Sequence, residues 1–344
     1  MDKASHLSVI LDLSPTQWHL SGLPSNKPSL PLSTFLSQML AFLNAHMACK
    51  DENSLAVFGA LPGKSVMLYS TTMPTDEQAI VPDSNTYRPF KILDSTVMQS
   101  ILQQVNALGE PEQEAPIDFV GALTKSLCYI NRVTNVASAR TEGIIGLPDP
   151  RILIISVSPD QSSSYISIMN SIFSAQKLKV TIDVCKLYGT DSVFLQQAAH
   201  LTGGSYINVE RPDALLQFLM MSFLPPPGIR QLISVPTQDK VDFRAACFCH
   251  KDIVDIGFVC SVCLSIFCSP VPVCSTCRTK FPMKTLQRLN AVKPKTTPTA
   301  SRPGTPGSLP RSTSIAPGGT PRAISNGNGN TLPVARNVAP SAPR

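Results

Sequence analysis

The sequence predicts an α/β fold with a doubly wound, mostly parallel sheet, followed by a small zinc-binding module and a disordered tail. Three observations lead to this prediction. Apolar runs typical of strands buried on both faces alternate with amphipathic helical patterns over residues 1–224. Seven of the ten cysteines fall within residues 247–277. Residues 290–344 contain ten prolines and six glycines but no aromatic residue, so they cannot bury enough apolar surface to fold.

Short apolar runs predict the strands of the sheet. The clearest is RILIISVS at residues 151–158, a near-continuous apolar run. Two runs flank Pro62-Gly63, which predicts a hairpin, and a Pro/Ser loop is expected after the first strand. Strands are therefore predicted at residues 9–13, 55–61, 65–70, 151–158, 179–187 and 205–209.

Between the strands, apolar residues recur at helical spacing. Residues 32–47 show it best, because their apolar positions follow i, i+3, i+4, i+7 and make one apolar face. The proline run at residues 225–227 ends the last helix and begins a Pro-rich linker, residues 225–244. Helices are predicted at residues 32–47, 90–105, 117–130, 165–176, 192–201 and 212–223.

The positive net charge belongs to the tail. Residues 290–344 hold seven basic and no acidic residues, which leaves 29 − 7 = 22 basic against 23 acidic residues in the remainder. The sequence therefore predicts a basic disordered tail over residues 286–344, not a basic folded face for nucleic acid. The first residues are polar and no apolar run approaches the roughly 20 residues of a membrane span, so we expect neither signal peptide nor membrane.

Two cysteine pairs predict a zinc site in a module at residues 245–285. Cys260 and Cys263 form one Cys-x-x-Cys knuckle, and Cys274 and Cys277 form the other. The two-residue gap lets both thiolates of a knuckle reach one ion at about 2.3 Å, and two knuckles complete a tetrahedron. Four thiolates leave no position for a catalytic water, so the site is expected to be structural.

A second set of ligands is interleaved with the first. Cys247, Cys249 and His250 lie upstream, and Cys268 lies between the knuckles. These residues fit a second zinc ion in the cross-brace order of RING-like modules, which would also raise the possibility of a ubiquitin ligase, although no groove for a conjugating enzyme is identifiable. In the alternative, Cys268 packs in an apolar run and Cys247 and Cys249 are free thiols. The sequence thus leaves one zinc ion or two.

The first strand ends in Asp12-Leu13-Ser14-Pro15-Thr16, which resembles the Asp-x-Ser-x-Ser signature of von Willebrand A domains, where a carboxylate and two hydroxyls help hold Mg²⁺. Asp160 would supply a later carboxylate of that motif. The threonine expected before the central helix is missing, because residues 112–120 contain none. We therefore expect a degenerate site without Mg²⁺.

Enzymatic activity is not expected. No predicted strand is followed by a glycine-rich loop of the type Gly-x-Gly-x-x-Gly or Gly-x-x-x-x-Gly-Lys-Ser/Thr. The loops that bind nucleotide phosphates are therefore missing. His6, His19, His46 and His200 have no nucleophile at a recognisable spacing.

The combination of motifs is specific to one family. The segment AHLTGGSY (199–206), a Pro-rich linker, CFCHKDIVDIGFVCSVCLSIFC (247–268) and CSTC (274–277) follow one another in this order. Residues 5–285 closely resemble the smaller von Willebrand A-like, zinc-finger-ended subunit of the core of the general transcription factor TFIIH. The resemblance implies a nuclear, non-catalytic scaffold subunit in RNA polymerase II initiation and nucleotide excision repair. It also implies pairing with the larger A-domain, zinc-containing subunit and, through it, contact with the helicases.

Two other functions are alternatives. A nucleic-acid-binding zinc protein would use Arg278, Lys280 and the basic tail, but Asp252 and Asp255 offset part of this charge. Direct nucleic-acid contact is therefore not expected as the main role. A ubiquitin-pathway A-domain adaptor would carry short helical ubiquitin-binding motifs, which the Pro/Gly tail lacks.

Overall fold

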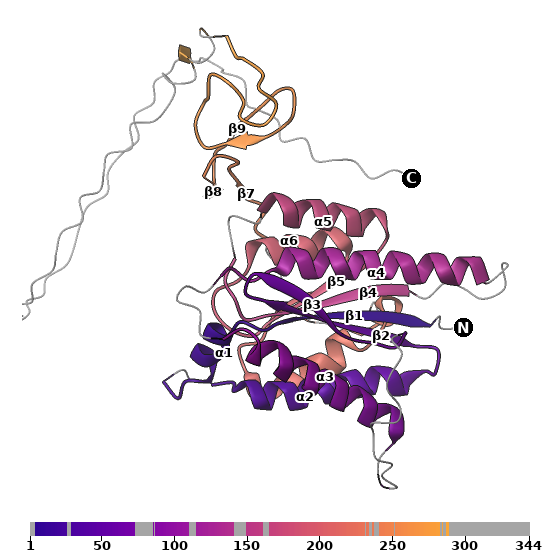
Figure 1. The fold of residues 1–344 in the computed structure, drawn as a ribbon. Coiled ribbons are helices and arrows are strands. Elements are labelled where there is room, and N and C mark those ends of the chain that lie inside the picture. Colours follow the sequence, from indigo (N-terminus) through magenta and orange to yellow (C-terminus); the bar gives the residue numbers. More distant parts are fainter. Residues whose placement is uncertain are drawn as a thin grey trace, which may run out of the picture. The chain divides into compact units, whose positions relative to one another are not determined.

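A six-stranded sheet forms the centre of the fold (Figure 1). Its order is β3-β2-β1-β4-β5-β6, and every neighbouring pair is parallel except the hairpin of β2 and β3. This confirms the predicted mostly parallel sheet of the α/β class. The strands are β1 (Ser5–Asp12), β2 (Ser54–Leu61), β3 (Lys64–Ser70), β4 (Asp149–Ser156), β5 (Thr181–Lys186) and β6 (Tyr206–Asn208). The computed structural model describes residues 4–25, 29–72, 85, 87–109, 115–140, 149–160, 165–230, 232–233, 236, 241–250, 252–282, 284 and 287–288.

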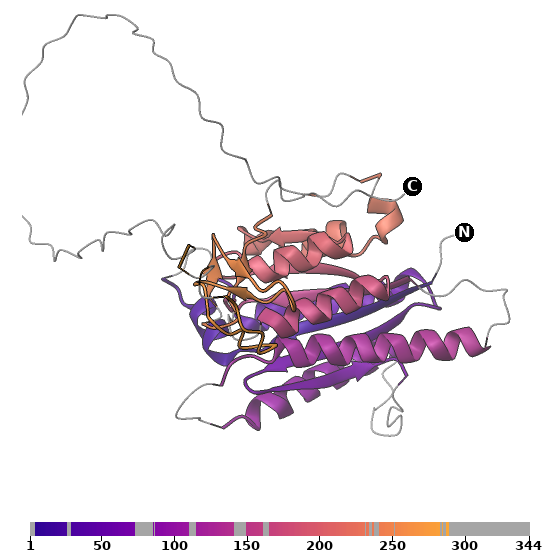
Figure 2. The same ribbon diagram turned by 90° about the horizontal axis from the view of Figure 1, so that it is seen from above.

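Helices cover both faces of the sheet, as Figures 1 and 2 show. On one face lie α2 (Leu32–Cys49) and α3 (Arg88–Asn106); on the other lie α4 (Phe119–Arg140), α5 (Tyr165–Lys177) and α6 (Val193–Thr202). Alternate side chains of a strand therefore enter different cores. In β4, Leu153 packs with the α2 side and Ile154 with the α4 side, which is why this strand is apolar throughout.

The first strand is longer than predicted, because its polar residues are buried too. β1 begins at Ser5 and is buried along its whole length. The His6 ring nitrogens lie 2.7 Å from Ser54 Oγ and 3.0 Å from Ser8 Oγ. These hydrogen bonds offset the cost of burying the imidazole.

The prediction of a loop directly after the first strand is wrong, because the helix α1 (Pro15–Gly22) begins there. Ser14 caps this helix by accepting a hydrogen bond from the Gln17 amide, and Pro15 occupies its first turn, where no amide proton is needed. Trp18 lies on α1, stacks on Phe35 and donates from Nε1 to the Asp12 carbonyl at 2.7 Å. It is an internal packing residue, not an interface anchor.

The segment after β6 is irregular. The helix predicted at residues 212–223 is a succession of one 3-10 turn (Pro212–Ala214), α7 (Leu215–Phe218) and a π-helical turn (Leu219–Phe223). The end of this segment is fixed by the fully buried Arg151. Its guanidinium donates hydrogen bonds to the carbonyls of Phe223, Leu224 and Pro225.

A further helical turn, α8 (Pro227–Arg230), lies in the segment predicted as a linker. Arg230 makes a two-pronged ion pair with the buried carboxylate of Asp183 on β5, at 2.6 and 2.8 Å. The first part of this segment is therefore attached to the sheet.

The cysteine-rich module is built from two short antiparallel ribbons. One pairs β7 (Ala245–Ala246) with β8 (Ile253–Val254), and the other pairs β9 (Phe258–Val259) with β10 (Ile266–Phe267). Its small core gathers Phe248, Phe267 and Phe281 around cysteine side chains, as expected for core aromatics, whereas Phe258 is half-buried outside it.

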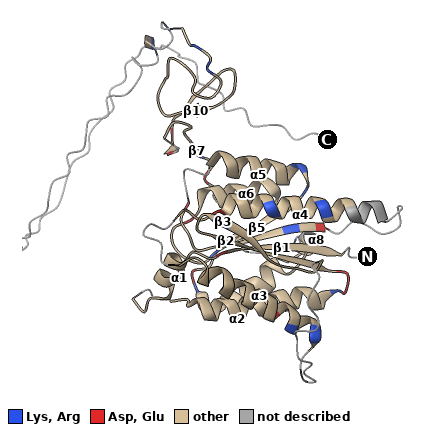
Figure 3. Ribbon diagram, in the orientation of Figure 1, with Lys and Arg blue, Asp and Glu red and all other residues tan. Residues whose placement is uncertain are grey.

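Lys, Arg, Asp and Glu residues are sparse along the helices and strands (Figure 3). Among the described residues, no helix is both long and apolar enough to cross a bilayer. The tail predicted for residues 286–344 lies outside the described residues, apart from residues 287–288.

Candidate metal centres

The structure brings the four cysteines of the first predicted zinc site together. The sulfur atoms of Cys260, Cys263, Cys274 and Cys277 all lie within 4.8 Å of one another. Cys260 Sγ is 3.7 Å from Cys277 Sγ, and Cys263 Sγ is 3.5 Å from Cys274 Sγ. A zinc ion with thiolates at about 2.3 Å places its sulfurs about 3.8 Å apart, so the cluster has nearly the size of a tetrahedral shell.

The two knuckles of this cluster have the same backbone geometry. In the first, the Leu264 amide donates to the Cys260 carbonyl at 3.0 Å, and the Cys260 amide donates to the Ser265 carbonyl at 2.9 Å. In the second, Arg278, Cys274 and Thr279 repeat this pattern, with both bonds at 2.9 Å. The repeat C-S-x-C-x-Ser/Thr in the sequence therefore encodes a repeated turn.

A hydroxyl group supports one thiolate of each knuckle. Ser265 Oγ lies 3.1 Å from Cys263 Sγ, and Thr279 Oγ1 lies 3.1 Å from Cys277 Sγ. The Ser265 hydroxyl, together with its backbone amide, lowers the pKa of Cys263 to about 6. The Thr279 hydroxyl and amide likewise lower the pKa of Cys277. These hydrogen bonds favour the thiolate, which is the form that binds metal.

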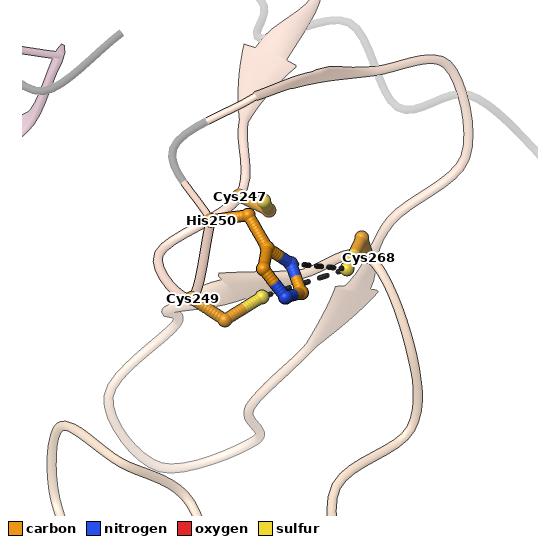
Figure 4. A group of neighbouring side chains, drawn as sticks. All are labelled: Cys247, Cys249, His250 and Cys268. Carbon is orange, nitrogen blue, oxygen red and sulfur yellow. Dashed lines mark hydrogen bonds between the residues drawn. The ribbon is translucent and has the colours of Figure 1, made fainter.

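The second predicted set also converges (Figure 4). Ligand atoms of Cys247, Cys249, His250 and Cys268 lie within 4.8 Å of one another. Cys268 Sγ is 3.5 Å from Cys249 Sγ and 3.2 Å from His250 Nδ1. Cys268 reaches this group because β10 ends immediately before it and the Phe248 amide donates to the Ile266 carbonyl at 2.7 Å. It is a member of this cluster and not a residue of the apolar core.

Each cluster offers four ligands of the type that zinc prefers, thiolate sulfur and imidazole nitrogen. Four protein ligands complete a tetrahedral shell, so neither cluster leaves a position for a substrate or a reactive water. Such sites can cross-link the short ribbons of the module. The ribbons need this, because a few backbone pairs alone stabilise a two-stranded ribbon only weakly.

The residues of the degenerate Mg²⁺ motif are engaged elsewhere. The Asp12 carboxylate is buried and accepts hydrogen bonds from the amides of Ser14, Val157 and Ser158 at 2.7–3.1 Å. Ser14 caps α1, and Thr16 is exposed in its first turn. Asp160 accepts hydrogen bonds from the Ser192 hydroxyl and the Phe194 amide at the beginning of α6.

A lysine supplies the positive charge at this edge of the sheet. Lys186, the last residue of β5, is fully buried, and its ammonium donates to the Ser158 carbonyl and lies 3.4 Å from Ser156 Oγ. Burial lowers the pKa of Lys186, whereas the charges of Asp12 and Asp160 act to raise it. An internal ammonium thus faces the carboxylates that a divalent cation would neutralise. Lys186 was not among the predicted site residues, although a lysine in an apolar strand was a usable signal.

Known proteins resemble this chain over most of its length. The family model of transcription factor Tfb4 matches residues 4–278. General transcription and DNA repair factor IIH subunit tfb4 of Schizosaccharomyces pombe is 41% identical over 290 residues, covering 83% of this chain and 92% of the relative. General transcription factor IIH subunit 3 of Dictyostelium discoideum is 39% identical over 263 residues, covering 73% and 68%.

Among solved structures, the crystal structure of the TFIIH p34 N-terminal domain is similar in both fold and sequence. Its TM-score is 0.54 at 29% identity, and the match covers 64% of this chain and 98% of that chain.

Proposed function

This chain belongs to the transcription factor Tfb4 family, and on that basis we propose that it is a non-catalytic scaffold subunit of the general transcription and DNA repair factor IIH. The observation that carries the proposal is the 41% identity to the fission yeast subunit over nearly its whole length. In this role the chain acts in the nucleus, in RNA polymerase II initiation and in nucleotide excision repair.

The chemistry of the described residues supports a role without catalysis. Both cysteine clusters present four protein ligands, and the acidic motif of the sheet is occupied by backbone amides and faced by Lys186. These features support a scaffold role.

We propose that the module holds two zinc ions. Cys260, Cys263, Cys274 and Cys277 would bind one ion, and Cys247, Cys249, His250 and Cys268 would bind the other. The sulfur spacing and the hydroxyl hydrogen bonds of Ser265 and Thr279 support this assignment. Bound zinc would cross-link a module at residues 245–285 that has ribbons of only two residue pairs each.

The proposed direct partner is the larger A-domain, zinc-containing subunit of the same factor, and through it the helicase subunits. A chain with only 15% charged residues and several large apolar side chains at its surface is suited to protein contacts of this kind. Domain, linker and module, at residues 1–224, 225–244 and 245–285, would supply separate surfaces for such contacts.

The proposal is tested by affinity purification of the tagged full chain from nuclear extract at moderate salt, with partners identified by mass spectrometry. We expect the larger A-domain subunit and the helicases in the eluate. A tagged unrelated von Willebrand A domain serves as the control for contacts of the shared fold. Recovery of the chain alone, or with proteasome subunits, contradicts the proposal.

A further inference from the structure

The hairpin of β9 and β10 exposes large apolar side chains to solvent. Ile256, Val259, Val262 and Leu264 have 77, 59, 65 and 71% of their surface exposed. Single exposed apolar residues are ordinary on protein surfaces, but four within nine positions of one hairpin are not.

The segment that carries these side chains has no charged residue after Asp255, which directly precedes Ile256. Residues 256–277 contain no Lys, Arg, Asp, Glu or His. Solvent-exposed knuckles elsewhere in proteins are free to carry charged residues, so a stretch of this length without one indicates a surface that is not selected for contact with water. A charged partner surface would lose its hydration on contact and find no counter-charge here.

The backbone at Leu264 strengthens this point. Leu264 follows the second cysteine of its knuckle and has φ of 62°, the left-handed region in which glycine is favoured. Arg278, at the equivalent position of the other knuckle, has φ of 60°. The turn itself would be better served by glycine, and the Leu264 side chain is too exposed to stabilise the module by burial. Packing within the module therefore does not account for an apolar side chain here, and the equivalent position of the other knuckle carries the charged Arg278 instead.

We propose that the hairpin formed by residues 256–267, with Leu264 at its turn, is a docking surface for an uncharged apolar face of another subunit of factor IIH. The inference rests on the proposed function and adds the surface that the module contributes. Leu264 and Val262 would insert into the partner.

Competition for incorporation tests the proposal. Wild-type chain and the Leu264→Gly variant are expressed together with different tags, and core factor IIH is captured through a helicase subunit. Glycine relieves the left-handed backbone and removes the side chain, so we expect an unfolding midpoint equal to or above that of the wild type, and about tenfold lower incorporation. Arg278→Gly is the matched control: it makes the same backbone change in the other knuckle, and we expect incorporation close to that of the wild type.

Val262→Ser provides a second test that leaves the turn unchanged, and we expect it to reduce incorporation as well. Equal incorporation of Leu264→Gly, Val262→Ser and wild type overturns the docking surface while leaving the proposed function standing. Failure of the wild type to enter the factor overturns the proposed function itself.

Two other occupants give distinct results, and both contradict the proposal. If light scattering shows a dimer of wild-type chains that Leu264→Gly abolishes, a second copy covers the hairpin. If the wild-type chain binds an apolar dye at the hairpin only after residues 289–344 are removed, the chain's own tail covers it.

Discussion

At the scale of single residues, charge at the carboxyl edge of the sheet is balanced internally. Asp12 is held by three backbone amides, and burial raises the pKa of its carboxyl group. The charge of Asp12 acts on the buried Lys186 ammonium, which donates hydrogen bonds to the Ser158 carbonyl and to Ser156 Oγ at the end of β4. The arrangement joins β1, β4 and β5 through polar contacts without requiring a metal ion.

Replacing this ammonium should destabilise the domain. Lys186→Met keeps most of the side-chain volume but leaves the Asp12 charge without its buried counter-charge, and we expect a loss of about 2 kcal/mol in the free energy of unfolding. Urea denaturation of the full chain measures it. Lys177→Met, on the exposed side of α5, is the control and should change stability by less than about 0.5 kcal/mol. An unchanged stability of Lys186→Met would show that the ammonium contributes nothing at this edge.

Two buried histidines make stability depend on pH. Burial, and then the charge of His46, lowers the pKa of His6 to about 4; burial, and then the charge of Arg151, lowers the pKa of His46 to about 4. Since the unfolded imidazoles titrate near 6.5, the unfolded state binds more protons at acid pH. Their contribution is complete above about pH 6.5 and is lost as the pH falls towards 4, by up to about 3 kcal/mol for each histidine.

Unfolding curves at pH 7.5, 6, 5 and 4.5 measure this loss. The variant His46→Gln keeps a polar side chain that does not titrate, so its stability should fall less steeply between pH 6.5 and 4.5 than that of the wild type. The same slope in both proteins would contradict the assignment to His46.

At the scale of elements, periodic apolar patterns predicted the strands and long helices well. Residues 151–158 were predicted correctly because burial on both faces of the sheet makes every position apolar. Residues 32–47 were predicted correctly because burial on one face of a helix gives the apolar residues a helical period. α1 was missed because it is only eight residues long and has no apolar stripe; its signal was the capping residue Ser14 followed by Pro15. The buried start of β1 was missed because Ser5, His6 and Ser8 are satisfied by hydrogen bonds that only the fold creates.

The cysteine spacing predicted the ligand groups for the same reason: a knuckle is a local structure. Cys260-x-x-Cys263 and Cys274-x-x-Cys277 each form within one turn. Cys268 joins its group only because β10 pairs with β9 and accepts a hydrogen bond from the Phe248 amide. The sequence could therefore not decide whether Cys268 binds a metal or packs in the apolar core. The hydroxyls of Ser265 and Thr279 could have been found from the repeated C-S-x-C-x-Ser/Thr pattern.

Metal content should follow the two ligand groups. We expect two zinc ions per wild-type chain by native mass spectrometry, and one in Cys268→Ser, because the group of Cys260 contains all its ligands without Cys268. Cys185→Ser is the control, since Cys185 is buried in the sheet and should not affect zinc. One zinc ion in the wild type, or two in Cys268→Ser, would contradict the second site.

At the scale of the whole molecule, polar clamps connect the sheet to the segments that follow it. The polar contacts of Arg151 and Arg230 attach the segment after the π-helical turn to the sheet. Further along, Gln197 on α6 donates to the carbonyls of Asp242 and Arg244 at 2.8 and 3.1 Å. Composition predicted a Pro-rich linker at residues 225–244, and these contacts could not be foreseen because they depend on which strands end beside one another. Such attachment suits a scaffold, which must hold its binding surfaces at fixed positions.

The proposed contact with the larger A-domain subunit of factor IIH can be measured with the two proteins alone. Co-expression of the two full-length chains, followed by size-exclusion chromatography with light scattering at moderate salt, tests it most directly. We expect the two chains to elute together as one complex with the mass of both. Separate elution of two folded, zinc-loaded proteins would contradict it.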